Sequence, residues 1–189
     1  PLNEWLEEQV SVWESAGSVN AQNEKFIANM PTEEVFSAPD FRRIDGVVKS
    51  TKPLSYAGNI IDGMTFRFAN GQVTEVTAEK GEDTIKRLVE ENDGEVALVP
   101  DPSPISQAGI VYFNTLFDEN ASNHLALGSA YASSVVGGTE MTQEELAAAG
   151  LNRSTTHVDF MIGSADMNID GIRKDGSVMP IFRNGDWAF

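Results

Sequence analysis

The chain has 189 residues, of which 41% are hydrophobic and 22% charged, a composition typical of one globular domain with its own core. Its 13 lysine and arginine residues against 29 aspartate and glutamate residues give a formal net charge of −16, which opposes binding to nucleic acid or to an anionic membrane surface. The absence of cysteine excludes disulfides, thiolate zinc sites and cysteine nucleophiles, and it suits a cytoplasmic protein.

The first part of the chain predicts one helix followed by strands. Apolar residues at helical spacing predict an amphipathic helix over residues 2–16, and residues 1–19 form the leading segment of the expected domain. Residues 44–79 then alternate apolar and polar side chains, which is typical of strands. Asn70-Gly71, between two such runs, is a strong signal for a tight hairpin turn.

The rest of the chain mixes short strands with short helices. The letters T-Q-E-E from Thr142 form a capping-box signature at the start of a helix that ends near Gly150. Residues 124–136 are rich in small side chains, which indicates close approach to a neighbouring backbone. The other predicted elements are an extended segment at 25–38, a helix at 81–92 and strands at 95–100, 156–163, 168–172 and 178–182.

These elements together predict an α+β fold with a curved, mixed, barrel-like β-sheet and interspersed helices. No linker, repeat or low-complexity tract interrupts the pattern, so we expect a single domain over residues 1–189. No apolar run approaches the length of about 18 residues that a membrane-spanning helix needs.

The chain has only two histidines, and one of them forms a His-x-Asp pattern on a predicted strand. Residues two apart on a strand point to the same face, so the side chains of His157 and Asp159 converge there. Such a pair binds a divalent metal through nitrogen and oxygen. The same pattern also describes an exposed pair or a simple histidine–aspartate hydrogen bond.

The other histidine, His124, is followed seven positions later by Tyr131. If this segment is helical, seven residues make about two turns, and the imidazole and the phenol share one face about 10 Å apart along the axis. The alternative is a buried tyrosine that hydrogen-bonds the backbone. Glu95 opens a buried-type strand, where an unpaired charge is costly.

Several segments taken together resemble one family. They are NMPTEEVFSAPDFRRIDGVV, TKPLSYAGNII, GEVALVPDPSPISQAG, FNTLFDENASNHLALGSAY and THVDFMIGSADMNIDGI. In this order, over about residues 20–189, they resemble the thermophilic metallo-aminopeptidase family of aminopeptidases T and S. On this resemblance the chain is the C-terminal catalytic half of such an enzyme.

The resemblance implies a pair of divalent ions held by carboxylates and histidines. Matched motif by motif, the implied metal ligands are Glu34, Glu95, His124, His157 and Asp159. Glu33 stands beside Glu34 in the same motif, so the first ligand is one of these two glutamates. The set contains no sulfur, which suits Zn²⁺, Co²⁺, Mn²⁺ or Mg²⁺.

The resemblance also implies catalytic roles. Glu95 is expected to bridge the two ions, and water acidified between them is expected to attack the first peptide bond of a short peptide with a free N-terminus. Tyr131 is expected to donate a hydrogen bond to the tetrahedral oxyanion. Family members form dimers, so a homodimer is expected for the full-length protein.

Two features depart from the family pattern. Asn92-Asp93-Gly94 runs directly into Glu95, where family members carry a few more residues. Nothing in the chain represents the family's N-terminal α/β domain, so we expect an upstream part to be missing. Two alternatives therefore stay open: a metal-binding module that needs the missing domain for catalysis, and a structural or dimerisation domain.

Overall fold

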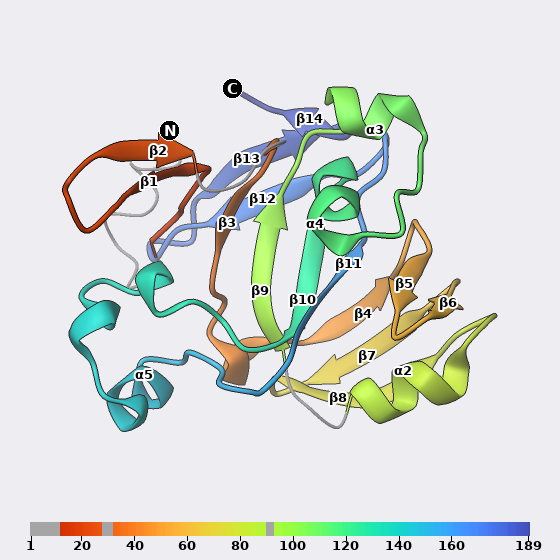
Figure 1. Cartoon of the computed structure of the whole chain (residues 1–189), viewed down its shortest axis with the longest axis horizontal. Helices are drawn as coiled ribbons and strands as arrows, with labels where there is room; N and C mark the ends of the chain where they lie inside the picture. The colour runs from red at the N-terminus through yellow and green to blue at the C-terminus, as the bar shows by residue number, and fades with distance from the viewer. Residues whose placement is uncertain (1–11, 28–31, 90–92) are drawn as a thin grey trace.

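The structure, a computed structural model, describes residues 12–27, 32–89 and 93–189. Its centre is a four-stranded sheet in the order β11-β10-β9-β3, and every pairing in it is antiparallel (Figure 1). The strands of this central sheet are β3 (Val35–Ser37), β9 (Asp93–Leu98), β10 (His124–Gly128) and β11 (His157–Met161).

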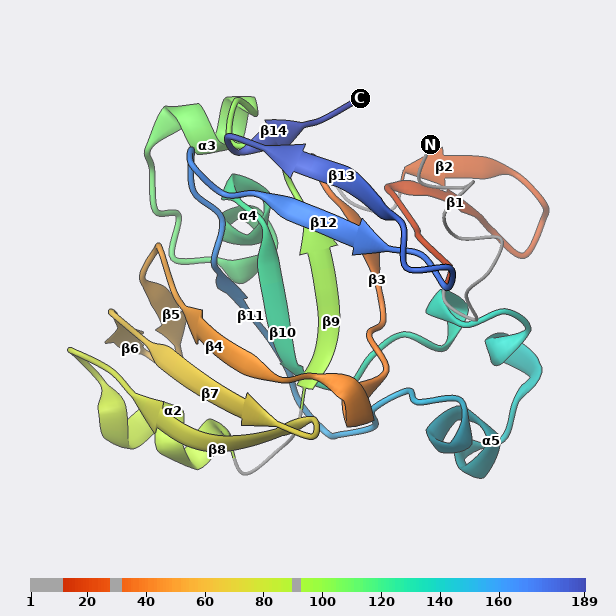
Figure 2. The same cartoon turned by 180° about the vertical axis from the view of Figure 1, so that it is seen from behind.

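Four smaller sheets surround the central one. A three-stranded sheet of order β4-β7-β8 lies beneath it in Figures 1 and 2, and a second of order β12-β13-β14 lies above it. The other two are the hairpins β1-β2 and β5-β6. These strands are β1 (Gly17–Val19), β2 (Lys25–Ile27), β4 (Gly46–Lys49), β5 (Leu54–Tyr56), β6 (Asn59–Ile61), β7 (Thr65–Ala69), β8 (Gln72–Thr77), β12 (Ile169–Ile172), β13 (Val178–Arg183) and β14 (Asp186–Trp187).

The helices of the described ranges are short and lie around the sheets rather than between them. The α-helices are α2 (Glu82–Leu88), α3 (Pro104–Ala108), α4 (Thr115–Asp118) and α5 (Gln143–Ala148), and the 3₁₀ turns are η1 (Phe41–Arg43), η2 (Glu119–Ala121), η3 (Ala132–Ser134) and η4 (Gly138–Glu140). No helix in these ranges has both the length and the apolar character that crossing a membrane requires.

The largest core cluster lies between the central sheet and the β4-β7-β8 sheet. Leu127 of β10 and Val158 and Phe160 of β11 pack there against Phe66 of β7 and Ile85 of α2. The rings of Phe66 and Phe160 are 4.5 Å apart between centroids. Because strand side chains alternate between faces, residues next to these core residues point to the opposite face of the central sheet.

Two local predictions are confirmed. Asn70 and Gly71, with φ of 51° and 73°, join β7 to β8 in the left-handed pair that a tight hairpin turn requires. At α5 the Thr142 hydroxyl accepts a hydrogen bond from the Glu145 amide, and the Glu145 carboxylate accepts one from the Thr142 amide at 2.7 Å. The α+β fold class is confirmed as well.

Other predictions need correction. Residues 12–16 are not helical, because Glu14 forms an antiparallel bridge with Phe36; residues 2–11 of that predicted helix lie outside the described residues. The helix predicted over 81–92 ends at Leu88, with 90–92 again outside. Among the described strands all pairings are antiparallel and none of the five sheets closes on itself, so the mixed, barrel-like sheet is not observed.

The most consequential error was the helical interpretation of the segment that contains His124. Residues 124–128 form the inner strand β10, not a helix, so the spacing of two helical turns to Tyr131 does not apply. Leu125 and Leu127 alternate with His124 and Ala126, a period of two that the small residues disguise. The predicted strands of the C-terminal region are observed as β11, β12 and β13.

Candidate metal centre

The strand register places three of the predicted ligands, His124, His157 and Asp159, on one face of the central sheet. Ala126 of β10 stands opposite Glu95 of β9 on one side and opposite Asp159 of β11 on the other. His157 lies two residues before Asp159, opposite Gly128, and His124 lies two residues before Ala126. Directly opposite residues share a face, as do residues two apart, so this face is the one turned away from the main core.

The other face of the same strands explains why this register holds. A slip of one residue would turn Val158 and Phe160 out of the core and bring the carboxylate of Asp159 into it. The hydrophobic core therefore fixes the register, and the register in turn aligns the ligands. Ala126, which stands between the two acidic positions, is small and fully buried.

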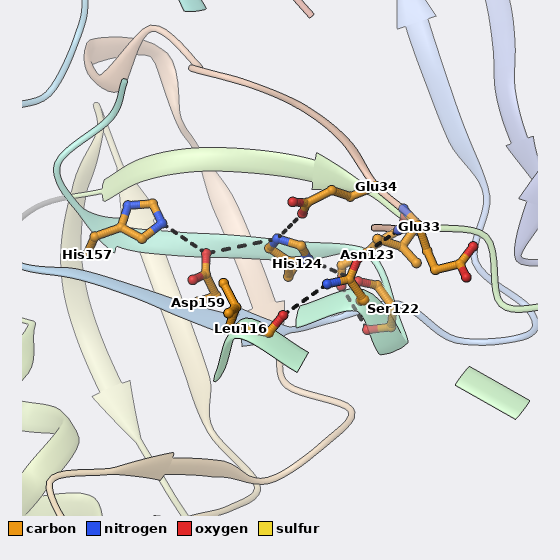
Figure 3. Close-up of polar contacts among 10 residues, drawn as sticks. Glu33, Glu34, Leu116, Ser122, Asn123, His124, His157 and Asp159 are labelled. Atoms are coloured by element: carbon orange, nitrogen blue, oxygen red, sulfur yellow. Dashed lines mark hydrogen bonds and ion pairs between the residues drawn. The ribbon is translucent and has the colours of Figure 1, made fainter. Parts of the chain in front are cut away.

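Glu34, just before β3, reaches the side chain of His124 from two strands away. Its Oε2 lies 3.1 Å from Nε2 of His124 (Figure 3). Strands one apart are about 4.8 Å from each other, so β3 and β10 are separated by about 10 Å. Ala97 lies between them in the same row as His124, and its small side chain leaves the path for a glutamate to cross β9.

Glu33 is placed differently. Its amide donates a hydrogen bond to Oδ1 of Asn120 at 2.7 Å, and its side chain points away from both histidines in Figure 3. The geometry therefore brings Glu34, and not Glu33, to His124. Glu95 occupies the expected place in the backbone register, and its side chain lies outside the described part of the structure.

The two histidines meet Asp159 from opposite sides. Oδ1 of Asp159 is 3.3 Å from Nε2 of His157 and 3.9 Å from Nε2 of His124 (Figure 3). His124 and Asp159 are buried, whereas 28% of the His157 side chain is exposed. The cluster thus runs from the interior at His124 to solvent at His157.

The far side of each imidazole ring is held by a backbone carbonyl. Nδ1 of His124 lies 3.1 Å from the carbonyl oxygen of Ser122, and Nδ1 of His157 lies 2.7 Å from that of Ser129. A carbonyl only accepts, so each Nδ1 carries the hydrogen and donates it. In the neutral rings each Nε2 then presents a lone pair toward the carboxylates, which is the tautomer that binds a metal ion.

In this tautomer one oxygen of each carboxylate lacks a donor. Within the part of the chain that the structure describes, the buried oxygens Oε2 of Glu34 and Oδ1 of Asp159 have no hydrogen-bond partner. Lone pairs of nitrogen and oxygen therefore face one another in a buried space, an arrangement that needs a cation. Either a proton on Nε2 or a metal ion between the side chains satisfies it, so the donor chemistry fits a divalent cation.

When no metal is bound, a proton on Nε2 of His124 is the cation that lies between the lone pairs. Burial lowers the pKa of its imidazolium, but the hydrogen bond with Glu34 and the negative charges of Asp159 and Glu34 outweigh burial and raise the pKa to about 9. Burial raises the pKa of Asp159, and hydrogen bonding from His157 with the charge of His124 lowers it overall. Among the described residues, no three histidine, aspartate or glutamate side chains are already arranged to hold a metal ion, and the imidazoles contact the carboxylates directly.

Tyr131 lies in the loop after β10, at the start of η3. Its ring centroid is 5.7 Å from that of His157 and 6.0 Å from that of Phe36. The tyrosine is 56% exposed, so the alternative of a buried tyrosine is not observed. The structure brings it to the histidine cluster through His157, and not through a helix shared with His124.

A cavity of about 560 Å³ opens over this face of the sheet. Glu34, Tyr131, His157 and Asp159 line it, and no lysine or arginine is among its described lining residues. Glu119 lines it too, and a hydrogen bond between the side chains of Glu119 and Asp159 contributes to the lowered pKa of Asp159. The sequence analysis missed Glu119 because it lies in an irregular segment with no periodic pattern, five residues before His124.

Known proteins share both this sequence and this fold. Aminopeptidase PepS of Streptococcus thermophilus is 67% identical over 94% of the chain, and aminopeptidase T of Thermus aquaticus is 42% identical over the same share. The structure of wild-type AmpT from Thermus thermophilus matches 96% of the chain with a TM-score of 0.89 and 41% identity. The chain spans 44% of each of these two relatives and 46% of the AmpT chain.

The family described as thermophilic metalloprotease (M29) matches residues 6–187, which is nearly the whole chain. This match agrees with the resemblance seen in the motifs and with the arrangement of histidines and carboxylates on the central sheet. The chain therefore belongs to the M29 family of thermophilic metalloproteases.

Proposed function

We propose that this chain is the metal-binding half of an aminopeptidase that removes the N-terminal residue from short peptides. The observation that carries the proposal is the pair of histidine Nε2 atoms turned toward two buried carboxylate oxygens that have no hydrogen-bond donor. The relatives are named aminopeptidases, and the family is one of metalloproteases, which supports a metal-dependent peptide hydrolase.

Two divalent ions are the proposed cofactors. Their donors would be Glu34, Glu95, His124, His157 and Asp159, with Glu119 as a further carboxylate at the same cavity. When bound, the ions supply Lewis acidity that polarises a peptide carbonyl and acidifies water. Nitrogen and oxygen donors without sulfur accept Zn²⁺, Co²⁺, Mn²⁺ or Mg²⁺, and the two imidazoles favour Zn²⁺ over Mg²⁺.

Glu95 has a specific place in this proposal. It stands opposite Ala126 in the same row as Asp159, on the middle strand between Glu34 and His124. A carboxylate at the centre of a donor set is suited to bridge two ions. With the ions bound, Glu95 would be the candidate carboxylate to hold both of them, and Asp159 would be a ligand beside His157.

Tyr131 is the proposed catalytic hydrogen-bond donor. It lines the cavity together with His157, and no described lining residue other than the histidine could compete as a cation for the oxyanion. A phenol held there donates to the oxygen that gains negative charge in the tetrahedral transition state. The residue is 56% exposed, so substrate in the cavity can reach it.

The alternative of a purely structural domain does not account for the cluster. A dimerisation domain gains nothing from burying His124 and Asp159, because burying ionisable groups costs free energy unless they are paired or bind a metal. The alternative of an incomplete module has one observation in its favour, namely that the chain spans 44% of its relatives' length. For the full-length protein we propose a homodimer.

The test measures metal content and turnover together. The chain is loaded with Zn²⁺ or Co²⁺, dialysed, and analysed for bound metal; a peptide and its N-acetylated form are then offered. We expect about two ions per chain and hydrolysis of the free-amine peptide alone. Two ions without hydrolysis would identify the incomplete module, and no retained metal would refute the proposal.

A further inference from the structure

A second, smaller hollow adjoins the candidate active site. It has a volume of about 280 Å³, and it shares Tyr131 and His157 with the larger cavity. The two side chains therefore stand between the hollows. Tyr131 is the proposed oxyanion donor and His157 a proposed ligand, so the peptide bond to be cleaved would lie at this boundary.

The two hollows differ in charge. The described lining of the larger cavity has four carboxylates, Glu14, Glu34, Glu119 and Asp159, and neither lysine nor arginine. The smaller hollow is lined by Arg153 and no carboxylate. The rest of its lining is Ser129, Ala130 and Ala132 beside the shared pair, so Arg153 is the one permanently charged side chain among its described lining residues.

Hydrogen bonds hold the backbone on both sides of Arg153. The amide of Ala130 donates to the carbonyl of Asn152 at 3.1 Å, and the amide of Ser129 donates to the carbonyl of Thr156 at 2.7 Å. The side chain of Asn152 also donates to the carbonyl of Gly128. Arg153 is thus carried by a segment tied to the end of β10, next to the boundary residues.

From this arrangement we infer that the smaller hollow receives the C-terminal part of a short peptide and that Arg153 binds its terminal carboxylate. The inference rests on the proposed function and adds the substrate class to it, namely peptides of two or three residues with both ends free. The planar guanidinium forms two parallel hydrogen bonds with a carboxylate. In a protein of net charge −16, such a site offsets the repulsion of an anionic ligand end.

The polarity of the two hollows also orients the peptide. The α-ammonium group is attracted to the acidic larger cavity, and the carboxylate to Arg153 on the other side of the boundary. The volume of about 280 Å³ is small, so we infer that the hollow accommodates one or two residues beyond the cleaved bond. Longer peptides would place their carboxylate past Arg153.

The test uses a dipeptide analogue whose scissile amide is replaced by a reduced bond, and the same analogue with its C-terminus amidated. Binding of both to the zinc-loaded 189-residue chain is measured by isothermal titration calorimetry. We expect the free acid to bind about fivefold more tightly than the amide, as suits an exposed charge pair. Arg153→Gln should bind both ligands at the level of the amide, and Arg153→Lys should keep part of the preference.

Arg67→Gln is the matched control, because Arg67 is an exposed arginine on β7 that lines neither hollow. Its substitution changes the net charge by the same amount as Arg153→Gln. Arg67→Gln should keep the full preference for the acid. Equal binding of acid and amide by the unsubstituted chain, an undiminished preference in Arg153→Gln, or no binding of either ligand would overturn the inference.

Hydrolysis of an aminoacyl amide, which has no carboxylate, separates this inference from the proposed function. A chain that hydrolyses the amide but shows no preference for the acid refutes the role of Arg153 alone. A chain that shows the preference, with its loss in Arg153→Gln, but hydrolyses nothing supports the carboxylate site and refutes the activity.

Discussion

A proton and a metal ion compete for Nε2 of His124, and this competition makes the stability of the metal-free chain depend on pH. The folded protein raises the pKa of His124 from 6.5 to about 9. A raised pKa means that the stabilisation is fully present below pH 6.5 and is lost as the pH rises to 9. This rise of the pKa corresponds to about 3 kcal/mol of the free energy of unfolding.

The measurement is urea unfolding followed by circular dichroism, after exhaustive chelation, at pH 6, 7.5 and 9. The chain should lose about 3 kcal/mol of stability over this range. His124→Gln removes the titrating group and serves as the control, so its unfolding free energy should change much less. If the unsubstituted chain stayed equally stable from pH 6 to 9, or if the variant lost as much, the buried imidazolium would not be what balances Glu34 and Asp159.

The same competition determines how the affinity for the metal changes with pH. Uptake of Zn²⁺ must displace the proton from His124, so metal affinity should rise with pH between 6.5 and 9, by up to about tenfold per unit from this group. Calorimetry at pH 7.5 in buffers of different ionisation enthalpy should show about one proton released from this residue. Stabilisation by metal therefore grows over the range in which stabilisation by the proton fades.

Three further predictions concern single residues. His157→Ala or Asp159→Ala should lose at least one bound ion, measured by metal analysis after dialysis, and full stoichiometry in both would refute their assignment as ligands. Tyr131→Phe should keep both ions and nearly unchanged substrate affinity, while turnover falls by roughly 10²–10³; a lower ion count would make Tyr131 a ligand, and unchanged turnover would exclude it as a catalyst. Gly71→Ala should lower the unfolding free energy by about 2–3 kcal/mol, because Gly71 has a φ of 73° and an added Cβ would lie 1.4 Å from the carbonyl oxygen of Phe41; unchanged thermal stability would contradict this.

Features with a local cause could be predicted from the sequence. Asn70-Gly71 specifies its turn because both residues tolerate positive φ, and Thr142 with Glu145 specifies a helix start through hydrogen bonds within one turn. The motif resemblance also identified the family, and three of the residues it named, His124, His157 and Asp159, lie on one face of the central sheet. Where the local signal was weak, prediction failed: small residues in β10 concealed its period of two, and residues 12–16 paired with Phe36 instead of forming a helix.

The centre itself depends on contacts between distant parts of the chain. Glu34, His124 and Asp159 come from three separate segments, and they meet because core packing of Val158 and Phe160 sets the register of β11 on β10. The tautomers of both histidines follow from carbonyls of the neighbouring backbone. No periodicity or spacing encodes such cross-strand distances, because they arise only when strands far apart in sequence pair. For the same reason, Glu119 and Arg153 could be recognised as candidate site residues only from their positions in the lining of the two cavities.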